Sequence, residues 1–145
     1  MKRTDEAVIV EKHFNVSQQT LWTAITDQQQ MRQWFFEEIE SFEPAVGFHT
    51  KFVIENEGRI FPHLWTILEV EQPKKITYKW SYEGYAGEAL VCFELKASKD
   101  STQLRLTHTI IQDFSDDIPE FSRENCLGGW TYFICERLAN FLHQP

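Results

Sequence analysis

This sequence of 145 residues has no cluster of cysteines, few basic residues and no long apolar run. Each of these features excludes a class of protein. The cysteines, Cys92, Cys126 and Cys135, show no CxxC spacing, and the histidines form neither HxH nor HExxH. An odd, scattered set of cysteines is typical of reduced thiols rather than of a disulfide framework or a zinc site. Phosphate-binding loops and GxSxG elbows are missing too. We therefore expect no metal, no cofactor and a cytoplasmic location.

Positive charge is also scarce, because 14 lysines and arginines stand against 22 aspartates and glutamates, for a formal net charge of -8. Nucleic acids and anionic membranes attract basic patches, which this sequence lacks. At the N-terminus, Asp5 and Glu6 precede an apolar run of only four residues, AVIV, which is too short for a signal peptide or a membrane span. We predict no nucleic-acid partner and no membrane insertion.

Apolar and aromatic residues are plentiful, at 42% and 14% of the sequence. A chain of this length and composition has the material for one core, so we expect a single domain over residues 1–145.

The stretch Phe121–His143 predicts a long C-terminal helix, because its apolar residues recur at steps of three and four. These residues are Leu127, Trp130, Thr131, Ile134, Leu138, Phe141 and Leu142. Ser122 and Asn125 offer capping side chains at its start. The pair Gly128-Gly129 interrupts the pattern. It indicates either close packing or a bend in the helix, or room for a ligand beside Trp130.

Short alternating runs precede this helix and predict an antiparallel sheet. Residues 7–14 are expected to form a first strand, Ser17 to cap a helix ending near Asp27, and 29–34 to form a second short helix. Period-two alternation then recurs between turn signals from residue 48 to residue 110. Pro62 indicates a bulge or an edge. The predicted fold is α+β, with a curved sheet of about six to seven strands wrapped around the C-terminal helix.

Several motifs in this order resemble the START-like or SRPBCC superfamily, and within it the family related to the C-terminal domain of the activator of Hsp90 ATPase. They are FNVS at 14–17, LWTAITD at 21–27, Trp34, VG at 46–47, ILEVEQPKKITYKW at 67–80, TQLRLTH at 102–108 and Gly129-Trp130. The resemblance covers nearly the whole chain. It implies the helix-grip fold and a hydrophobic cavity between the sheet and the long helix.

The positions expected to point between sheet and helix are rich in aromatic residues, which form the walls of many small-molecule pockets and of many solid cores. His108 lies on the same face and is either a core histidine with an ordinary partner or a polar anchor in a pocket. His63 has the same two interpretations, and Phe35 and Phe36 lie near an expected mouth. The candidate ligand-binding residues are Trp34, Phe48, Phe52, Tyr78, Trp80, Phe93, His108, Trp130 and Ile134.

Three functions fit these features. We favour binding of a small apolar or aromatic molecule in the cavity, without established catalysis. A cyclase-like or hydratase-like enzyme would need two polar groups that converge on one point, with His108 or Tyr78 as acid or base, and no catalytic residue is assigned. The family resemblance implies a third function, a co-chaperone-like interaction with an Hsp90-type ATPase. The protein is expected to be a monomer or a homodimer.

Overall fold

Six antiparallel strands form one sheet in the structure, a computed structural model that describes residues 1–143. The strands are β1 (Val8–Phe14), β2 (His49–Asn56), β3 (Arg59–Glu71), β4 (Lys75–Tyr82), β5 (Glu88–Ala97) and β6 (Thr102–Gln112). Their order across the sheet is β1-β6-β5-β4-β3-β2, so strands β1 and β2 form the two edges. The α+β helix-grip fold predicted from the sequence is confirmed.

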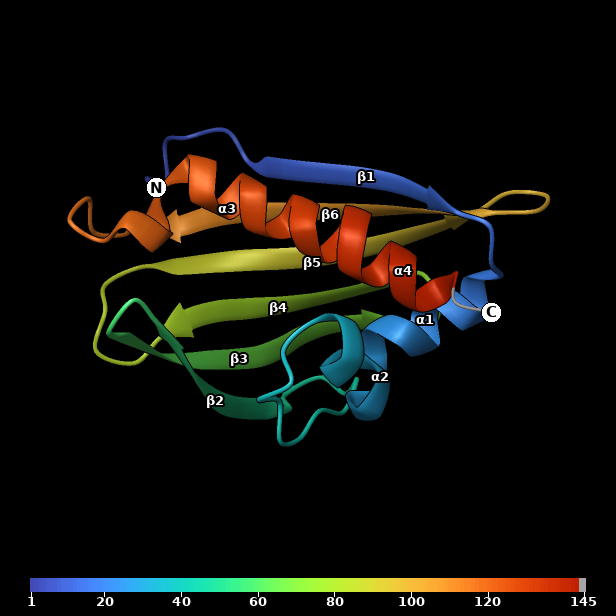
Figure 1. Cartoon of the computed structure of the whole chain (residues 1–145), viewed down its shortest axis with the longest axis horizontal. Helices are drawn as coiled ribbons and strands as arrows, with labels where there is room; N and C mark the ends of the chain where they lie inside the picture. The colour runs from blue at the N-terminus through green and yellow to red at the C-terminus, as the bar shows by residue number, and fades with distance from the viewer. Residues whose placement is uncertain (144–145) are drawn as a thin grey trace.

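The helical segments lie on one face of this sheet (Figure 1). They are α1 (Gln18–Thr26), α2 (Gln28–Trp34), the short 3-10 helix η1 (Pro119–Phe121), α3 (Arg123–Thr131), the π-helical segment η2 (Tyr132–Leu138) and α4 (Ala139–Leu142). Side-chain oxygens of Ser17, Asp27 and Ser122 cap α1, α2 and α3 by accepting a backbone N–H of the first turn. The sequence therefore sets the start of each helix locally.

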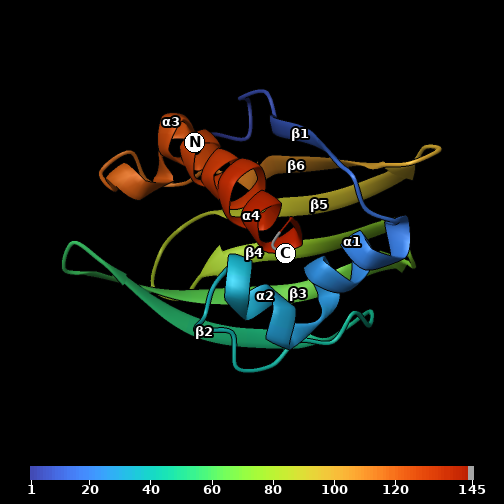
Figure 2. The ribbon, with the colours of Figure 1, turned by 45° about the vertical axis from the view of Figure 1, so that its right-hand side comes forward.

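The C-terminal helix crosses the concave face of the sheet, as Figure 2 shows from a second side. It differs from the continuous α-helix expected over Phe121–His143, because Phe121 belongs to η1 and the middle of the helix is π-helical. Its buried residues are Trp130, Ile134 and Leu138, at steps of four. A turn wider than 3.6 residues keeps such steps in line from Trp130 onward, whereas Leu127 lies in the α-helical part before the π-helical segment and is 45% exposed.

Alternation along the strands decides which side chains enter the core. On β4 the buried residues are Ile76, Tyr78 and Trp80, and on β6 they include Leu106 and His108. The period-two pattern of the sequence thus identified the inner face of these strands correctly.

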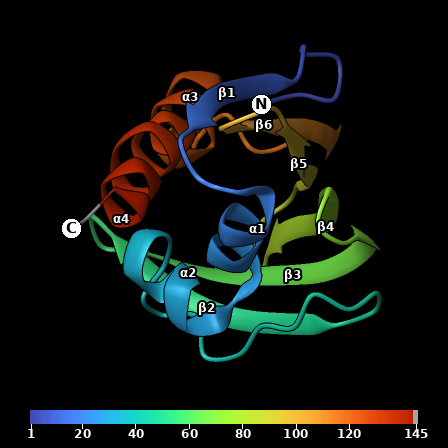
Figure 3. The same cartoon turned by 90° about the vertical axis from the view of Figure 1, so that its right-hand side faces the viewer.

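The two ends of the concave face are covered by different elements, and Figure 3 faces the end where α1 and α2 lie. Helices α1 and α2 lie over one end, where the Arg137 Nη2 donates to the Gln33 carbonyl oxygen at 2.7 Å and joins the C-terminal helix to α2. The hairpin between β2 and β3 and the 3-10 helix η1 lie at the opposite end of the sheet, as Figure 1 shows. The two ends are called the helix-covered end and the hairpin end below.

Pro62 forms no bulge, but it lies just past the end of the β3–β4 pairing, so the interruption that the sequence indicated is a local edge on the β4 side. Pro62 pairs with Val53 in an unbroken β2–β3 register, within a strand that has a neighbour on each side. The pairing of β3 with β4 stops at His63 and Tyr82, and beyond it the Glu83 N–H donates to the Pro62 carbonyl oxygen. The missing N–H of Pro62 therefore lies where the β4 ladder ends, so no bond within the ladder is lost.

Candidate functional site

A cavity of about 540 Å³ lies at the hairpin end, between the sheet and the start of the C-terminal helix. Eight of its twenty lining residues are Phe, Trp or Tyr. The lining residues are Met1, Phe36, Ile54, Asn56, Glu57, Arg59, Phe61, His63, Trp80, Tyr82, His108, Phe114, Pro119, Glu120, Phe121, Asn125, Cys126, Gly129, Trp130 and Phe133. Pockets for small molecules have volumes of roughly 300–1,000 Å³ and mainly apolar walls with a few polar groups. The cavity fits this description.

Strand alternation and register bring the floor of the cavity together. His63 on β3 lies directly across from Tyr82 on β4, and Trp80 lies two residues from Tyr82 on the same face. Farther across the sheet, β6 contributes His108. Non-adjacent segments of the sequence thus supply side chains to one floor.

Helix α3 forms the roof with Trp130 and Gly129. A Cβ atom built on Gly129 meets no heavy atom within 4 Å, and the same is true at Gly128. Close packing therefore does not explain this glycine pair. Of the two glycines, Gly129 lines the cavity together with Trp130 and Gly128 does not.

His108 and Trp130 join the floor to the roof by a hydrogen bond. The Trp130 Nε1–H donates to the His108 Nδ1 over 3.0 Å. Both residues are buried, since Trp130 is 4% exposed and His108 is 6% exposed. Burial lowers the pKa of His108 to about 4, so its imidazole is neutral near pH 7. The His108 Nε2 has no hydrogen-bond partner among the described residues.

His63 is the second buried histidine of the floor, at 5% exposed. Burial lowers its pKa to about 4, although a hydrogen bond to a backbone carbonyl opposes part of this shift. That bond joins the His63 Nδ1 to the Phe61 oxygen at 2.9 Å. A carbonyl oxygen only accepts, so the proton is on Nδ1 and the Nε2 carries the lone pair.

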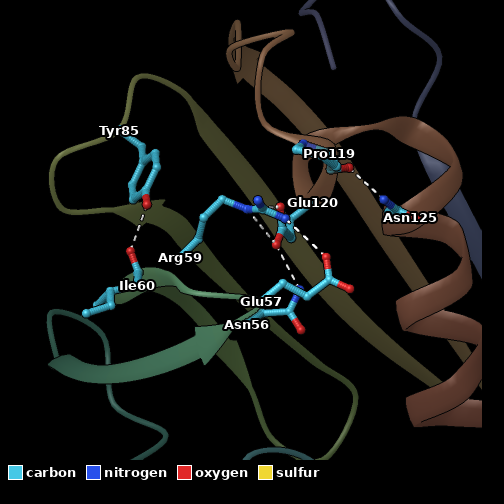
Figure 4. A network of polar contacts seen from close by, with 8 residues as sticks. All are labelled: Asn56, Glu57, Arg59, Ile60, Tyr85, Pro119, Glu120 and Asn125. Atoms are coloured by element: carbon cyan, nitrogen blue, oxygen red, sulfur yellow. Dashed lines mark hydrogen bonds and ion pairs between the residues drawn. The ribbon is translucent and has the colours of Figure 1, made fainter.

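A polar network closes the hairpin end around the mouth of the cavity (Figure 4). The Arg59 Nε donates to both carboxylate oxygens of Glu120, at 2.8 and 3.0 Å, and the Asn56 Nδ2 donates to one of them at 2.8 Å. These bonds connect the β2–β3 hairpin to η1. Asn125 then joins η1 to α3, because its Nδ2 donates to the Pro119 carbonyl oxygen at 2.6 Å.

Arg59 is the cation of this network and pairs with the carboxylates of both Glu120 and Glu57. Partial burial alone would raise the pKa of Glu120, but the hydrogen bonds from Arg59 and Asn56 outweigh it and leave the pKa below its usual range. The same hydrogen bond to Glu120 raises the pKa of Arg59. Both groups are therefore charged near neutral pH.

The structure brings three of the predicted ligand-binding residues together at the cavity: Trp80, His108 and Trp130. The other six do not line it. Trp34, Tyr78, Phe93 and Ile134 are fully buried in the core, Phe52 is 3% exposed beside the floor, and Phe48 is half-buried just before β2. The alternation of a strand shows which face a side chain occupies, but not which end of the sheet lies over empty space.

Sequence reasoning missed much of the rest of the lining. Phe61 follows the alternation that places His63 and Trp65 inward, so its inward position could have been read from the strand. Phe121 and Phe133 fall outside the apolar stripe expected for a regular α-helix. The Arg59–Glu120 pair joins residues 61 apart in the sequence, and no local pattern predicts it.

The lining offers little reactive chemistry. Burial raises the pKa of the Cys126 thiol to about 12, which keeps it protonated, and burial also raises the pKa of the Tyr82 hydroxyl. Within residues 1–143, no group of three or more His, Cys, Asp or Glu side chains is placed to hold a metal ion. No helix in the same range is long and apolar enough to cross a membrane.

Comparison with known proteins shows which family shares this arrangement. Residues 15–143 match the sequence model of the family described as Activator of Hsp90 ATPase homolog 1-like protein. The comparison with curated proteins gives no match.

Several solved structures are similar in fold. DynU16, a protein in the dynemicin biosynthetic locus, is 22% identical with a TM-score of 0.74. The match covers 97% of this chain but 48% of DynU16, so the chain spans about half the length of that protein. CV1439 from Chromobacterium violaceum is 17% identical with a TM-score of 0.78 and coverage of 97% of this chain and 99% of its own. The Aha1 dimer from Colwellia psychrerythraea is 16% identical with a TM-score of 0.71, covering 95% and 96%.

Proposed function

The chain belongs to the Activator of Hsp90 ATPase homolog 1-like family, and from that premise we propose that it binds a small apolar or aromatic molecule in the cavity at the hairpin end. The observation that carries the proposal is a space of about 540 Å³ walled by aromatic side chains inside a domain of only 145 residues. Protein cores are otherwise packed with few voids larger than a water molecule. An apolar ligand would bury the exposed faces of these rings.

The relatives agree with a role in handling small molecules. DynU16 comes from a biosynthetic locus, and it shares the fold over 97% of this chain. The described residues of the lining supply shape, aromatic faces and a few neutral polar groups rather than an activated nucleophile, since the Cys126 thiol is protonated. These features favour binding over catalysis.

Gly129 gives the proposal a sharp test, because Gly128 beside it is a matched control. A leucine at either position replaces a glycine in the same helix, where neither Cβ meets an atom within 4 Å. Only the leucine at 129 projects from the cavity lining. With fluorene, an uncharged aromatic hydrocarbon, as the probe, we expect binding to raise the midpoint of thermal unfolding of the wild type. The increase is equivalent to about 2.7 kcal/mol at a hundredfold excess over the dissociation constant.

The proposal predicts that Gly129→Leu loses most of this shift and that Gly128→Leu retains it. Unfolding without fluorene reports the effect of each leucine on stability, which removes helix propensity from the comparison. An equal shift in both variants would place the binding elsewhere on the protein. If fluorene and a panel of other uncharged aromatic compounds give no shift, the proposed function fails.

The family name carries a second candidate function, interaction with an Hsp90-type ATPase. It predicts that the purified chain changes the ATPase rate of such a chaperone. Gly129→Leu separates the two functions, because the leucine fills the cavity and leaves the rest of the protein surface unchanged. A rate effect retained in this variant, together with no binding of any aromatic compound, would favour the chaperone partner.

A further inference from the structure

The two histidines of the cavity floor hold their protons on different nitrogens. An indole N–H only donates, so the bond from the Trp130 Nε1 fixes a lone pair on the His108 Nδ1. The ring is neutral because burial lowers its pKa to about 4, and its single proton is therefore on Nε2. His63 has the opposite tautomer, with its proton on Nδ1 and bonded to the Phe61 oxygen. Of the two, only His108 keeps an unused N–H donor.

This donor lacks any partner in the described part of the chain. The His108 Nε2 is buried and exposes less than 1 Å². Leaving a buried donor unpaired destabilises a protein, because the N–H has lost its hydrogen bond to water and gained none in return. Buried polar groups are nearly always paired, so an unpaired one at a cavity calls for an explanation. A ligand that supplies an acceptor oxygen would provide it.

The space for such a ligand lies beside the imidazole. His108 lines the cavity, and its neighbours there are the rings of Trp80, 6.3 Å away between centroids, and Trp130, 6.1 Å away. Because the Nε2 itself is covered, an oxygen reaches it when a neighbouring ring such as that of Trp80 moves, since a turn of the imidazole or of Trp130 would break the bond that fixes the lone pair on Nδ1. The Trp80 Nε1 is a second buried donor without a partner in the lining.

The charges of the lining decide which acceptor fits. The charged groups of the lining are Glu57, Arg59, Glu120 and the N-terminal ammonium of Met1. Arg59 and Glu120 bind each other, and the ammonium donates to the Phe121 carbonyl oxygen at 2.9 Å. The lowered pKa of His108 arises from burial without a contribution from any of these charges. No cationic side chain of the lining lies beside His108. A carboxylate or phosphate there would be buried without a compensating charge, which is strongly unfavourable. A carbonyl oxygen is a strong acceptor without charge.

We infer that the ligand class of this cavity is an uncharged aromatic ketone, whose carbonyl oxygen accepts a hydrogen bond from the His108 Nε2–H while its rings lie against Trp80 and Trp130. The inference rests on the proposed function, because it names the chemistry of the molecule that the cavity binds.

Fluorene and 9-fluorenone form a matched pair of probes, since they share three fused rings and differ by a CH₂ or a C=O at one position. The affinity of each is measured by quenching of tryptophan fluorescence. The quantity of interest is the ratio of the fluorenone affinity to the fluorene affinity. We expect His108→Phe to lower this ratio about tenfold relative to the wild type, the effect of one hydrogen bond of about 1.4 kcal/mol. We expect His49→Phe, the same substitution at an exposed histidine outside the cavity lining, to leave it unchanged.

A measurement on the wild type avoids any dependence on how the variants fold. In a nitrogen–proton NMR spectrum of the imidazoles, fluorenone should move the His108 Nε2-bound proton downfield, and fluorene should not. If both probes bind with the same ratio in wild type and His108→Phe, and this proton stays in place, the ketone inference is wrong while apolar binding stands. If neither probe binds, the inference and the proposed function both fail.

Discussion

The helix-covered end and the hairpin end of the same sheet are built from the same kinds of residue, yet one is solid and the other hollow. Trp65 on β3 is fully buried, with the rings of Phe35, Phe52 and Tyr78 at centroid distances of 5.5, 4.8 and 5.0 Å. Trp80, its neighbour on β4, borders the cavity. The centroids of the two tryptophan rings are only 5.1 Å apart. The boundary between packed core and open space therefore runs between two adjacent tryptophans.

The difference arises from what covers each end. At the helix-covered end, α1 and α2 supply residues such as Leu21, Ile25 and Trp34, all fully buried, which fill the space above the strands. At the hairpin end no helix pair is inserted, and the cover is the helix α3, the 3-10 helix η1 and the polar network of Arg59 and Glu120. Aromatic content alone thus does not distinguish a core from a binding site. The elements that lie over it do.

The largest expected effect compares the two adjacent tryptophans. Trp65→Ala should lower the free energy of unfolding by about 3–5 kcal/mol, as large-to-small substitutions of fully packed aromatic residues do. Trp80→Ala should cost about half as much, because one side of its ring already faces empty space and makes fewer contacts. Urea denaturation measures both. Equal losses, with wild-type m-values, would show that the hairpin end is as tightly packed as the other.

The second-largest expected effect is a loss of the free energy of unfolding in acid, caused by the two buried histidines at the hairpin end. Burial lowers the pKa values of His63 and His108 to about 4 in the folded protein, against about 6.5 when unfolded. Between these values the unfolded chain binds more protons, so stability falls as the pH drops from about 6.5 to about 4. Each histidine contributes a slope of up to about 1.4 kcal/mol per pH unit.

Variants separate this effect from that of the carboxylates. His63→Phe and His108→Phe should each reduce the slope above pH 5, whereas the favourable interactions of Glu120, whose pKa is lowered, are lost mainly at lower pH. Denaturation curves at a series of pH values report the slope. A slope in this window that survives both substitutions together would contradict the buried, neutral state of the two imidazoles.

The smallest expected effect is the change in stability when a tyrosine hydroxyl is removed. It should have opposite signs at the two ends of the sheet. The Tyr78 hydroxyl is buried in the core without a hydrogen-bond partner within residues 1–143, so Tyr78→Phe should be neutral or stabilise by up to about 1 kcal/mol. The Tyr85 hydroxyl donates to the Ile60 carbonyl oxygen at 2.8 Å beside the mouth, so Tyr85→Phe should cost about 0.5–1 kcal/mol. Thermal unfolding compares them. A destabilising Tyr78→Phe would indicate a partner for that hydroxyl.

The contrast between the ends also explains what the sequence could predict. Alternation along β4 and β6 gave the inner face that holds Trp80 and His108, because a period of two is a local property of the strand. The position of the cavity was harder to predict, since Tyr78 and Trp80 follow the same alternation along β4 and differ only in which elements cover them. The mouth of the cavity is formed by the hydrogen bonds between Arg59 and Glu120, which are far apart in the sequence. The π-helical segment of the C-terminal helix also changed which of its residues face inward.

The five tryptophans give the most direct test of the central claim, that the hairpin end and not the helix-covered end receives an aromatic ligand. Trp80 and Trp130 line the cavity, whereas Trp22 and Trp34 lie on α1 and α2. In a nitrogen–proton NMR spectrum each indole N–H gives its own signal, which the ring current of bound fluorene would move. The account predicts that fluorene shifts the signals of Trp80 and Trp130 and leaves those of Trp22 and Trp34 in place. Shifts confined to Trp22 and Trp34, or no shift at any indole, would contradict it.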